Sequence, residues 1–125
     1  MGKVLIVDDS ALMRRLIRSM IEDLADSVVE CEDGQQALGL YAQHAPDWVF
    51  MDMQMKVMDG LTATREIKSL FPKARIVMVT QHDSPALRAE AIKAGVVNYI
   101  VKQDLVALRE IISNPCESQP AISVR

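Results

Sequence analysis

Apolar and polar positions along the chain follow two alternating patterns. Short runs rich in β-branched residues alternate, five times over, with longer segments whose apolar residues recur at helical spacing. The short runs predict strands at 3–8, 27–32, 47–52, 75–80 and 97–101. Strands that alternate strictly with helices form parallel sheets through right-handed crossovers, with helices on both faces. The pattern therefore predicts a single doubly wound α/β domain of the (βα)5 type.

Capping residues mark the predicted helix ends. The residues that favour helix starts are Ser10, Asp33 with Gln36, Asp59 with Gly60, and Ser84 with Pro85. Gly95 is placed to end the fourth helix in a left-handed turn. Helical periodicity stops after about residue 113. We therefore expect the domain to span residues 1–113, and residues 114–125 to form a flexible tail or the start of a linker.

Reactive or ligating side chains follow four of the apolar runs. Asp8 and Asp9 come after the first strand, Asp52 ends the third, Thr80 ends the fourth and Lys102 follows the fifth. Because parallel strands all point the same way, these ends gather at one edge of the sheet. In doubly wound sheets the ligand crevice lies beyond the carboxyl ends of the strands. The sequence thus predicts three carboxylates, a hydroxyl and an ammonium in one crevice.

These residue types suit a divalent cation and a phosphoryl group. Two carboxylates ~4 Å apart repel by about 4 kcal/mol at an effective dielectric constant near 20, so such a cluster needs a counter-cation. Carboxylate oxygens combined with water and phosphate oxygens are the ligands of Mg²⁺. The metal and Lys102 together would neutralise a transferred phosphoryl group. A carboxylate such as Asp52 can act as the nucleophile and become an aspartyl-phosphate.

Composition and charge narrow the class of protein. A chain of 125 residues fits one domain, and its net charge of −3 argues against a general nucleic-acid binder. The apolar runs are much shorter than the ~20 residues that span a bilayer, and the chain enters its first strand too early for a signal peptide. Cys31 and Cys116 lack the spacing of a disulfide or metal site. We therefore expect reduced thiols, a cytoplasmic location and no membrane partner.

Four segments carry a resemblance to a known family. They are VLIVDDS (4–10), MDMQMKVMDG (51–60), VMVT (77–80) and AGVVNYIVK (94–102). In order and spacing the chain, from residue 2 to about 113, resembles the receiver domain of bacterial two-component response regulators. The resemblance implies a flavodoxin-like sheet with strand order 2-1-3-4-5. It also implies a phosphorylation-controlled signalling switch that catalyses only its own phosphotransfer and dephosphorylation, and so is not an enzyme in the ordinary sense.

The same resemblance implies roles for the residues of the crevice. Asp52 would accept a phosphoryl group from a histidine kinase or a histidine phosphotransfer protein. The implied Mg²⁺ ligands are Asp9 and Asp52 directly, Asp8 mainly through water, and Gln54 through its backbone carbonyl.

Thr80 and Lys102 would then contact the phosphoryl group. Tyr99 matches the aromatic residue whose rotamer changes together with the threonine. The resulting change would reach an output domain or target protein through the face formed by the fourth helix, the fifth strand and the fifth helix.

The chain departs from the family pattern at three positions near this edge. Lys56 and Gln103 stand where the family has prolines, and Gln81 replaces a small residue. A cis bond costs ~3 kcal/mol more before a residue that is not proline, so the sequence alone does not determine the conformation of the Lys102–Gln103 bond. A lysine followed by a residue other than proline also resembles the nitrate-response branch of the family. Gln54 and His82 occupy positions that, in the family, tune hydrolysis of the acyl phosphate.

The sequence is also compatible with two alternative functions, and it predicts one further surface feature. A receiver-like binding module that works without phosphorylation remains open because of Gln81 and Gln103. A small Mg²⁺-dependent aspartyl phosphohydrolase is disfavoured, because such enzymes need a second acid at the position of Gln54. Finally, Arg14, Arg15 and Arg18 predict a basic, solvated face on the first helix, where the family's kinase-docking surface lies.

Overall fold

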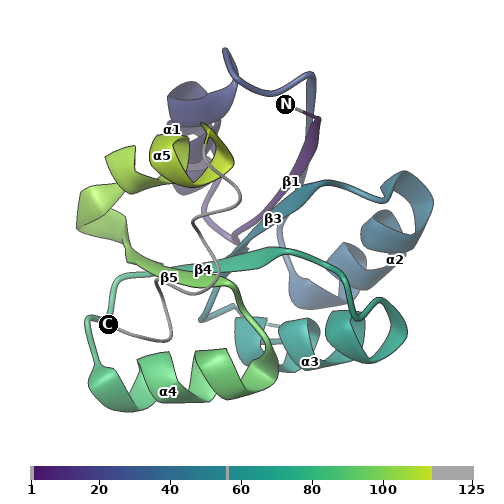
Figure 1. Ribbon diagram of the computed structural model, residues 1–125, viewed down its shortest axis with the longest axis vertical. Coiled ribbons are helices and arrows are strands. Elements are labelled where there is room, and N and C mark those ends of the chain that lie inside the picture. Colours follow the sequence, from purple (N-terminus) through teal and green to yellow (C-terminus); the bar gives the residue numbers. More distant parts are fainter. Residues whose placement is uncertain (1, 56, 114–125) are drawn as a thin grey trace.

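The computed structural model describes residues 2–55 and 57–113, in which five strands alternate with five α-helices (Figure 1). The strands are β1 (Lys3–Val7), β2 (Ser27–Cys31), β3 (Trp48–Asp52), β4 (Ile76–Thr80) and β5 (Asn98–Val101). The helices are α1 (Ala11–Ile21), α2 (Gly34–His44), α3 (Gly60–Leu70), α4 (Pro85–Ala94) and α5 (Val106–Ser113). A short 3-10 turn, η1 (Lys102–Asp104), joins β5 to α5. Lys56, Cys116 and the predicted tail lie outside the described residues.

All five strands are parallel, in the order β2-β1-β3-β4-β5. The predicted fold and strand order are therefore confirmed, and each strand end falls within one residue of its predicted position. Helices α1 and α5 cover one face of the sheet, and α2, α3 and α4 cover the other (Figure 1). The chain order reverses between β1 and β3, which is where a ligand crevice forms in sheets of this kind.

Successive residues of each strand supply two separate apolar layers, because side chains alternate across a sheet. Leu5 and Met51 pack toward α2, α3 and α4. Ile6 and Phe50 pack on the opposite side, against Leu108 and other residues of α1 and α5. All five residues of β3 and of β4 are buried. The central strands are thus held rigidly from both faces, and so are the polar residues at their ends.

The predicted helix caps are present. Ser10, Asp33, Asp59 and Ser84 each accept a hydrogen bond from the backbone N–H three residues later. Gly95 ends α4 with φ of +110°. The Gln36 side chain differs slightly from a standard capping box, since it accepts from the backbone N–H of Glu32 at 3.2 Å. The local signals that start and stop each helix therefore act as the sequence predicts.

Two further features concern the backbone and the helices of the described part of the chain. It contains no cis peptide bond, so the Lys102–Gln103 bond is trans and leads directly into η1. None of its helices is long and apolar enough to cross a membrane.

Candidate functional site

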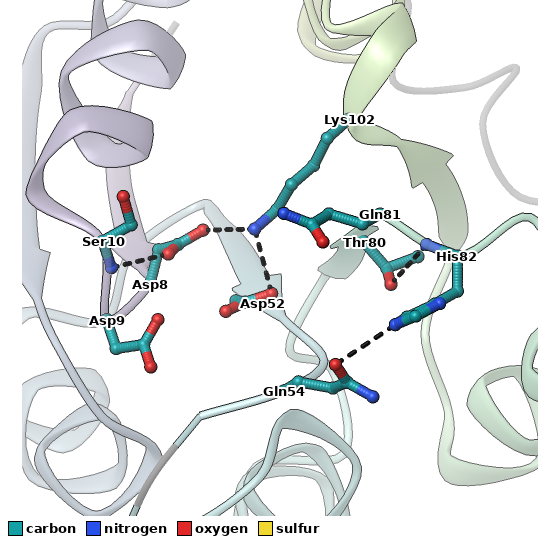
Figure 2. Close-up of a pocket in the computed structure, with 9 residues that line it drawn as sticks. All are labelled: Asp8, Asp9, Ser10, Asp52, Gln54, Thr80, Gln81, His82 and Lys102. Atoms are coloured by element: carbon teal, nitrogen blue, oxygen red, sulfur yellow. Dashed lines mark hydrogen bonds and ion pairs between the residues drawn. The ribbon is translucent and has the colours of Figure 1, made fainter.

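The carboxyl edge of the sheet carries a polar pocket (Figure 2). Its cavity of about 130 Å³ is lined by Asp8, Asp9, Ser10, Asp52, Gln54, Thr80, Gln81, His82 and Lys102. Asp52 and Thr80 are the last residues of β3 and β4, and Lys102 directly follows β5. The five side chains predicted from strand ends therefore meet in one pocket. Tyr99, the predicted switch residue, lies in β5 and is buried, and it is not among the residues that line the pocket.

Lys102 joins two of the carboxylates. Its Nζ lies 3.0 Å from Asp8 Oδ2 and 3.2 Å from Asp52 Oδ1. Asp8 and Asp52 are both buried, and the Lys102 side chain is 10% exposed. A buried ionised carboxylate without a counter-charge destabilises the folded state, so the Lys102 ammonium stabilises Asp8 and Asp52 in their ionised forms. Figure 2 shows it bridging from β5 across to the ends of β1 and β3.

Burial and charge shift the protonation of this cluster. The pKa of Asp52 is raised to about 6, chiefly by burial and secondly by the Asp8 charge, while Lys102 opposes both effects. Burial alone would lower the pKa of Lys102, but the neighbouring Asp52 and Asp8 carboxylates outweigh it and raise that pKa above its usual value. At neutral pH the pocket therefore holds an ionised Asp52 beside a protonated lysine.

The three acids also meet the requirements of a divalent cation. Asp8, Asp9 and Asp52 each offer a carboxylate oxygen, and these oxygens lie within 4.8 Å of one another. Asp9 is exposed at the mouth of the pocket, while Asp8 and Asp52 line its floor. Clustered carboxylate oxygens with open access to water fit Mg²⁺ by ligand type.

Thr80 and Tyr99 are linked through the backbone of His82. The backbone N–H of His82 donates to Thr80 Oγ1 at 3.1 Å, and the Tyr99 hydroxyl donates to the carbonyl of His82 at 2.6 Å. Tyr99 is 3% exposed, and the guanidinium carbon of Arg88 lies 4.7 Å from the centroid of its ring. The ring therefore already occupies the interior in this structure.

The mouth of the pocket is spanned by a contact that sequence reasoning missed. His82 Nε2 lies 3.1 Å from Gln54 Oε1, and both side chains are exposed (Figure 2). The two residues come from the loops after β4 and β3. Each was expected near the site, but nothing in their spacing of 28 residues predicts that they touch.

The predicted basic face on α1 needs correction. Arg14 and Arg18 do not simply face solvent, because both form ion pairs with Glu30 of β2, at 3.2 and 2.6 Å. Arg14 Nη1 also donates to the backbone carbonyl of Asp8 at 2.6 Å. Only Arg15 of the three fits the solvated description. The long guanidinium side chains reach across to the neighbouring strand, a contact that helical spacing does not reveal.

A parallel β2-β1-β3-β4-β5 sheet whose carboxyl edge unites three acids, a threonine and a lysine defines a receiver-type α/β domain. The family model described as "Response regulator receiver domain" matches residues 4–113. The chain belongs to the response regulator receiver family. The more specific nitrate-response branch stays a prediction.

Known proteins resemble the chain closely in sequence and in structure. The chemotaxis protein CheY of Bacillus subtilis is 42% identical over 101 residues, which cover 80% of this chain and 84% of that protein. A two-component response regulator of the LuxR family from Aurantimonas has a TM-score of 0.86 at 30% identity, covering 98% of this chain and 93% of the other. The receiver domain of the Arabidopsis thaliana histidine kinase CKI1, solved with Mg²⁺, has a TM-score of 0.79 at 29% identity, and the match covers 91% of each chain.

Proposed function

We propose that the protein is a signalling switch in which Asp52 accepts a phosphoryl group from the phosphohistidine of a histidine kinase or a histidine phosphotransfer protein. The observation that carries the proposal is the position of Asp52. Its carboxylate ends a fully buried strand, lies 3.2 Å from Lys102 Nζ and shares a pocket with Asp8 and Asp9. A nucleophile, a fixed cation and two metal-ligating acids are the groups that phosphoryl transfer requires.

The transfer itself needs no external acid. With its pKa near 6, Asp52 is mostly ionised at neutral pH and is a competent nucleophile. A carboxylate oxygen bonds to phosphorus as the phosphorus–nitrogen bond to the donor imidazole breaks, and the bonding electron pair returns to that nitrogen. The product is a mixed anhydride on Asp52. Lys102 remains beside it as a positive partner for the oxygens of the phosphoryl group.

Asp8, Asp9, Asp52 and the backbone carbonyl of Gln54 are the proposed ligands of Mg²⁺. When bound, the ion would supply positive charge to offset the phosphoryl oxygens and the acids themselves. The clustered carboxylate oxygens support this assignment, as does the receiver domain of CKI1 solved with Mg²⁺. The chain's own contribution is to hold Asp8 and Asp52 in place by burial and by Lys102.

Signal transmission would run through Thr80 and Tyr99. A phosphoryl group on Asp52 would accept a hydrogen bond from the Thr80 hydroxyl, and turning Thr80 toward it would disturb the bond that Thr80 Oγ1 now accepts from the N–H of His82. Because the Tyr99 hydroxyl is held by the carbonyl of the same residue, a shift of this backbone would alter the tyrosine. Such a local event biases a two-state element. The proposed readout surface is the α4–β5–α5 face, which would contact an output domain or target protein.

Domain limits and location complete the proposal. We take residues 1–113 as the receiver domain, residues 114–125 as a tail or linker, and the cytoplasm as the location. Family membership supports these assignments, since the family model ends at residue 113.

Phosphorylation by a small donor tests the central assignment. Incubation with acetyl phosphate and Mg²⁺ should add one phosphoryl group, detected by intact mass, and chelation with EDTA should prevent it. The Asp52→Asn variant should show no addition. Asp23→Asn is the matched control, because Asp23 follows α1, pairs with Arg109 of α5 at 2.7 Å and is not among the residues that line the pocket.

Three results would overturn the assignment. Labelling that persists in Asp52→Asn would place the acceptor elsewhere. Wild-type protein that resists labelling at saturating Mg²⁺ would favour the binding module that works without phosphorylation. Steady turnover of a simple phosphomonoester would instead revive the phosphohydrolase.

A further inference from the structure

Asp8 and Asp9 lie at the bend between β1 and α1, where the peptide group that joins them belongs to neither element. The Asp8 N–H extends the sheet by donating to the Cys31 carbonyl at 3.1 Å. The Asp8 carbonyl has a different partner, the guanidinium of Arg14 at 2.6 Å. One side chain of α1 therefore holds this peptide group, and it comes from the first turn of the helix that the peptide leads into.

The guanidinium is itself anchored. Arg14 Nε donates to Glu30 Oε1 at 3.2 Å, and Glu30 lies on β2 opposite Ile6 of β1. The Arg14 side chain is 17% exposed and that of Glu30 is 29% exposed, so water weakens this ion pair only in part. An arginine that is fixed at one end of its planar fork presents its remaining donors in a defined direction. Glu30 thus orients the Arg14 guanidinium toward the Asp8 carbonyl.

Fixing this carbonyl fixes the start of Asp9. The peptide unit is planar, so the carbonyl direction of Asp8 sets the direction of the Asp9 N–H and the position of its Cα. The Asp9 side chain is exposed, and no hydrogen bond or ion pair in the described part of the chain holds its carboxylate. Its placement beside Asp8 and Asp52 therefore depends on the backbone beneath it (Figure 2).

We propose that Arg14, aimed by Glu30, is a positioning residue that sets the affinity of the acid cluster for a divalent cation. The inference rests on the proposed function. Partners that orient a metal ligand typically change metal affinity by about 10–100-fold when removed. Arg14 does so here through the backbone between two ligands, without touching the ion.

Arg18 supplies a matched control on the same helix. It also pairs with Glu30, at 2.6 Å, and carries the same charge, but none of its hydrogen bonds reaches Asp8 in the described structure. Loss of a nearby positive charge strengthens the binding of a cation if only Coulomb interactions matter. If Arg14 acts by positioning, its removal weakens Mg²⁺ binding, whereas simple electrostatics predicts that its removal strengthens binding. Removal of Arg18 shows the electrostatic effect alone.

The experiment is calorimetric titration of full-length Arg14→Gln, Arg14→Lys, Arg18→Gln and wild-type protein with Mg²⁺ at pH 7.5. We expect Arg14→Gln to bind Mg²⁺ about tenfold more weakly than wild type. Arg14→Lys should recover part of the loss, because an ammonium can reach the carbonyl but cannot also bridge to Glu30. Arg18→Gln should bind at least as tightly as wild type. Denaturant unfolding of each variant identifies the fraction that is folded.

Equal or tighter binding by folded Arg14→Gln, relative to Arg18→Gln, would overturn the inference. Labelling by acetyl phosphate provides a second readout, since Arg14→Gln should need more Mg²⁺ for half-maximal rate yet approach the wild-type rate at saturation. A rate that stays low at saturating Mg²⁺, with unchanged Mg²⁺ affinity, would also contradict it. Failure of the proposed function is distinguishable, because wild-type protein itself would then neither bind Mg²⁺ nor be labelled at Asp52.

Discussion

The Tyr99 hydroxyl donates a 2.6 Å hydrogen bond to the backbone carbonyl of His82, the residue whose N–H is bound by Thr80. A buried tyrosine of β5 and the end of β4 are thereby tied to one residue of the loop over Asp52. The chemical event proposed at Asp52 and the face proposed for signalling thus share a single backbone segment.

Removing the hydroxyl should loosen this segment. We expect Tyr99→Phe to lower the free energy of unfolding by about 1 kcal/mol, because the ring stays packed while the carbonyl of His82 loses a partly buried hydrogen-bond donor. Urea unfolding followed by circular dichroism measures the change. Tyr41→Phe is the control, since Tyr41 is half-buried and packs on Phe71 through its ring, and it should cost less than about 0.5 kcal/mol. Equal effects of the two substitutions would contradict the assigned role of the hydroxyl.

The raised pKa of Asp52 predicts a pH-dependent stability. The folded protein releases this proton near pH 6, while an unfolded aspartate releases it near 3.9. Between these values the folded state binds more protons, so its stability falls as pH rises. The stability from the protonated carboxyl is fully present below about pH 4 and is lost above about pH 6.

Asp52→Asn removes the charge and should therefore be stabilising at high pH. Without divalent cations we expect the free energy of unfolding to rise by about 2 kcal/mol at pH 8, and this gain should shrink toward zero near pH 4. The upper limit is about 3 kcal/mol, because that is the free energy that corresponds to raising the pKa from its unfolded value to about 6. Thermal or urea unfolding across this pH range provides the test. A difference that does not vary with pH would show that the charge of Asp52 is not the cause.

Lys102 should be essential for holding the acids together when no metal is bound. Lys102→Met removes the partner of two buried carboxylates and should cost about 3 kcal/mol at pH 7, as in other broken buried pairs. Because the pKa of Lys102 is raised, this contribution should persist through neutral pH and disappear only as pH rises past its ordinary alkaline range.

Added Mg²⁺ offers a control for the same variant. It should stabilise Lys102→Met more than wild type, because the ion replaces the missing positive charge. Lys102→Arg, which keeps the charge, should lose less stability than Lys102→Met. Equal stabilisation of Lys102→Met and wild type by Mg²⁺ would argue against a shared electrostatic role.

Gly60 sets the position of the Asp52 backbone. A Cβ at Gly60 would lie 2.1 Å from the Asp52 carbonyl oxygen, where the N-terminus of α3 packs against the end of β3. Gly60→Ala should therefore destabilise the fold by about 2–4 kcal/mol and slow labelling of Asp52. The matched control is Gly39→Ala, since nothing lies within 4 Å of a Cβ at that helical position. That variant should gain about 0.5–1 kcal/mol and label normally.

Much of this protein could be predicted from local patterns. The alternation of apolar runs with helical stripes predicted every strand and helix, and the caps at Ser10, Asp33, Asp59 and Ser84 placed the helix starts. The polar strand ends predicted the pocket, because parallel strands carry their last residues to a common edge. Each of these signals depends on residues that are close together in the chain, so it can be recognised from the sequence alone.

The contacts that were missed depend on how side chains reach across the folded domain. Arg14 was expected to face solvent, yet it reaches Asp8 and, on the adjacent strand, Glu30. The bond between His82 and Gln54 joins two loops 28 residues apart. Side-chain reach of this kind depends on which strands are neighbours and on the rotamers that packing selects, and neither is encoded in spacing along the chain.

The sequence by itself therefore determined the element order, the class of fold and the residue types gathered at the carboxyl edge. Only the tertiary structure decided that Lys102 bridges Asp8 and Asp52, that burial and the nearby acid raise the pKa of Asp52, and that Arg14 holds the peptide between the two acids. The physical reason is range. Periodicity and capping depend on near neighbours in the chain, whereas charge pairing and desolvation depend on distances that exist only after strands far apart in sequence have come together.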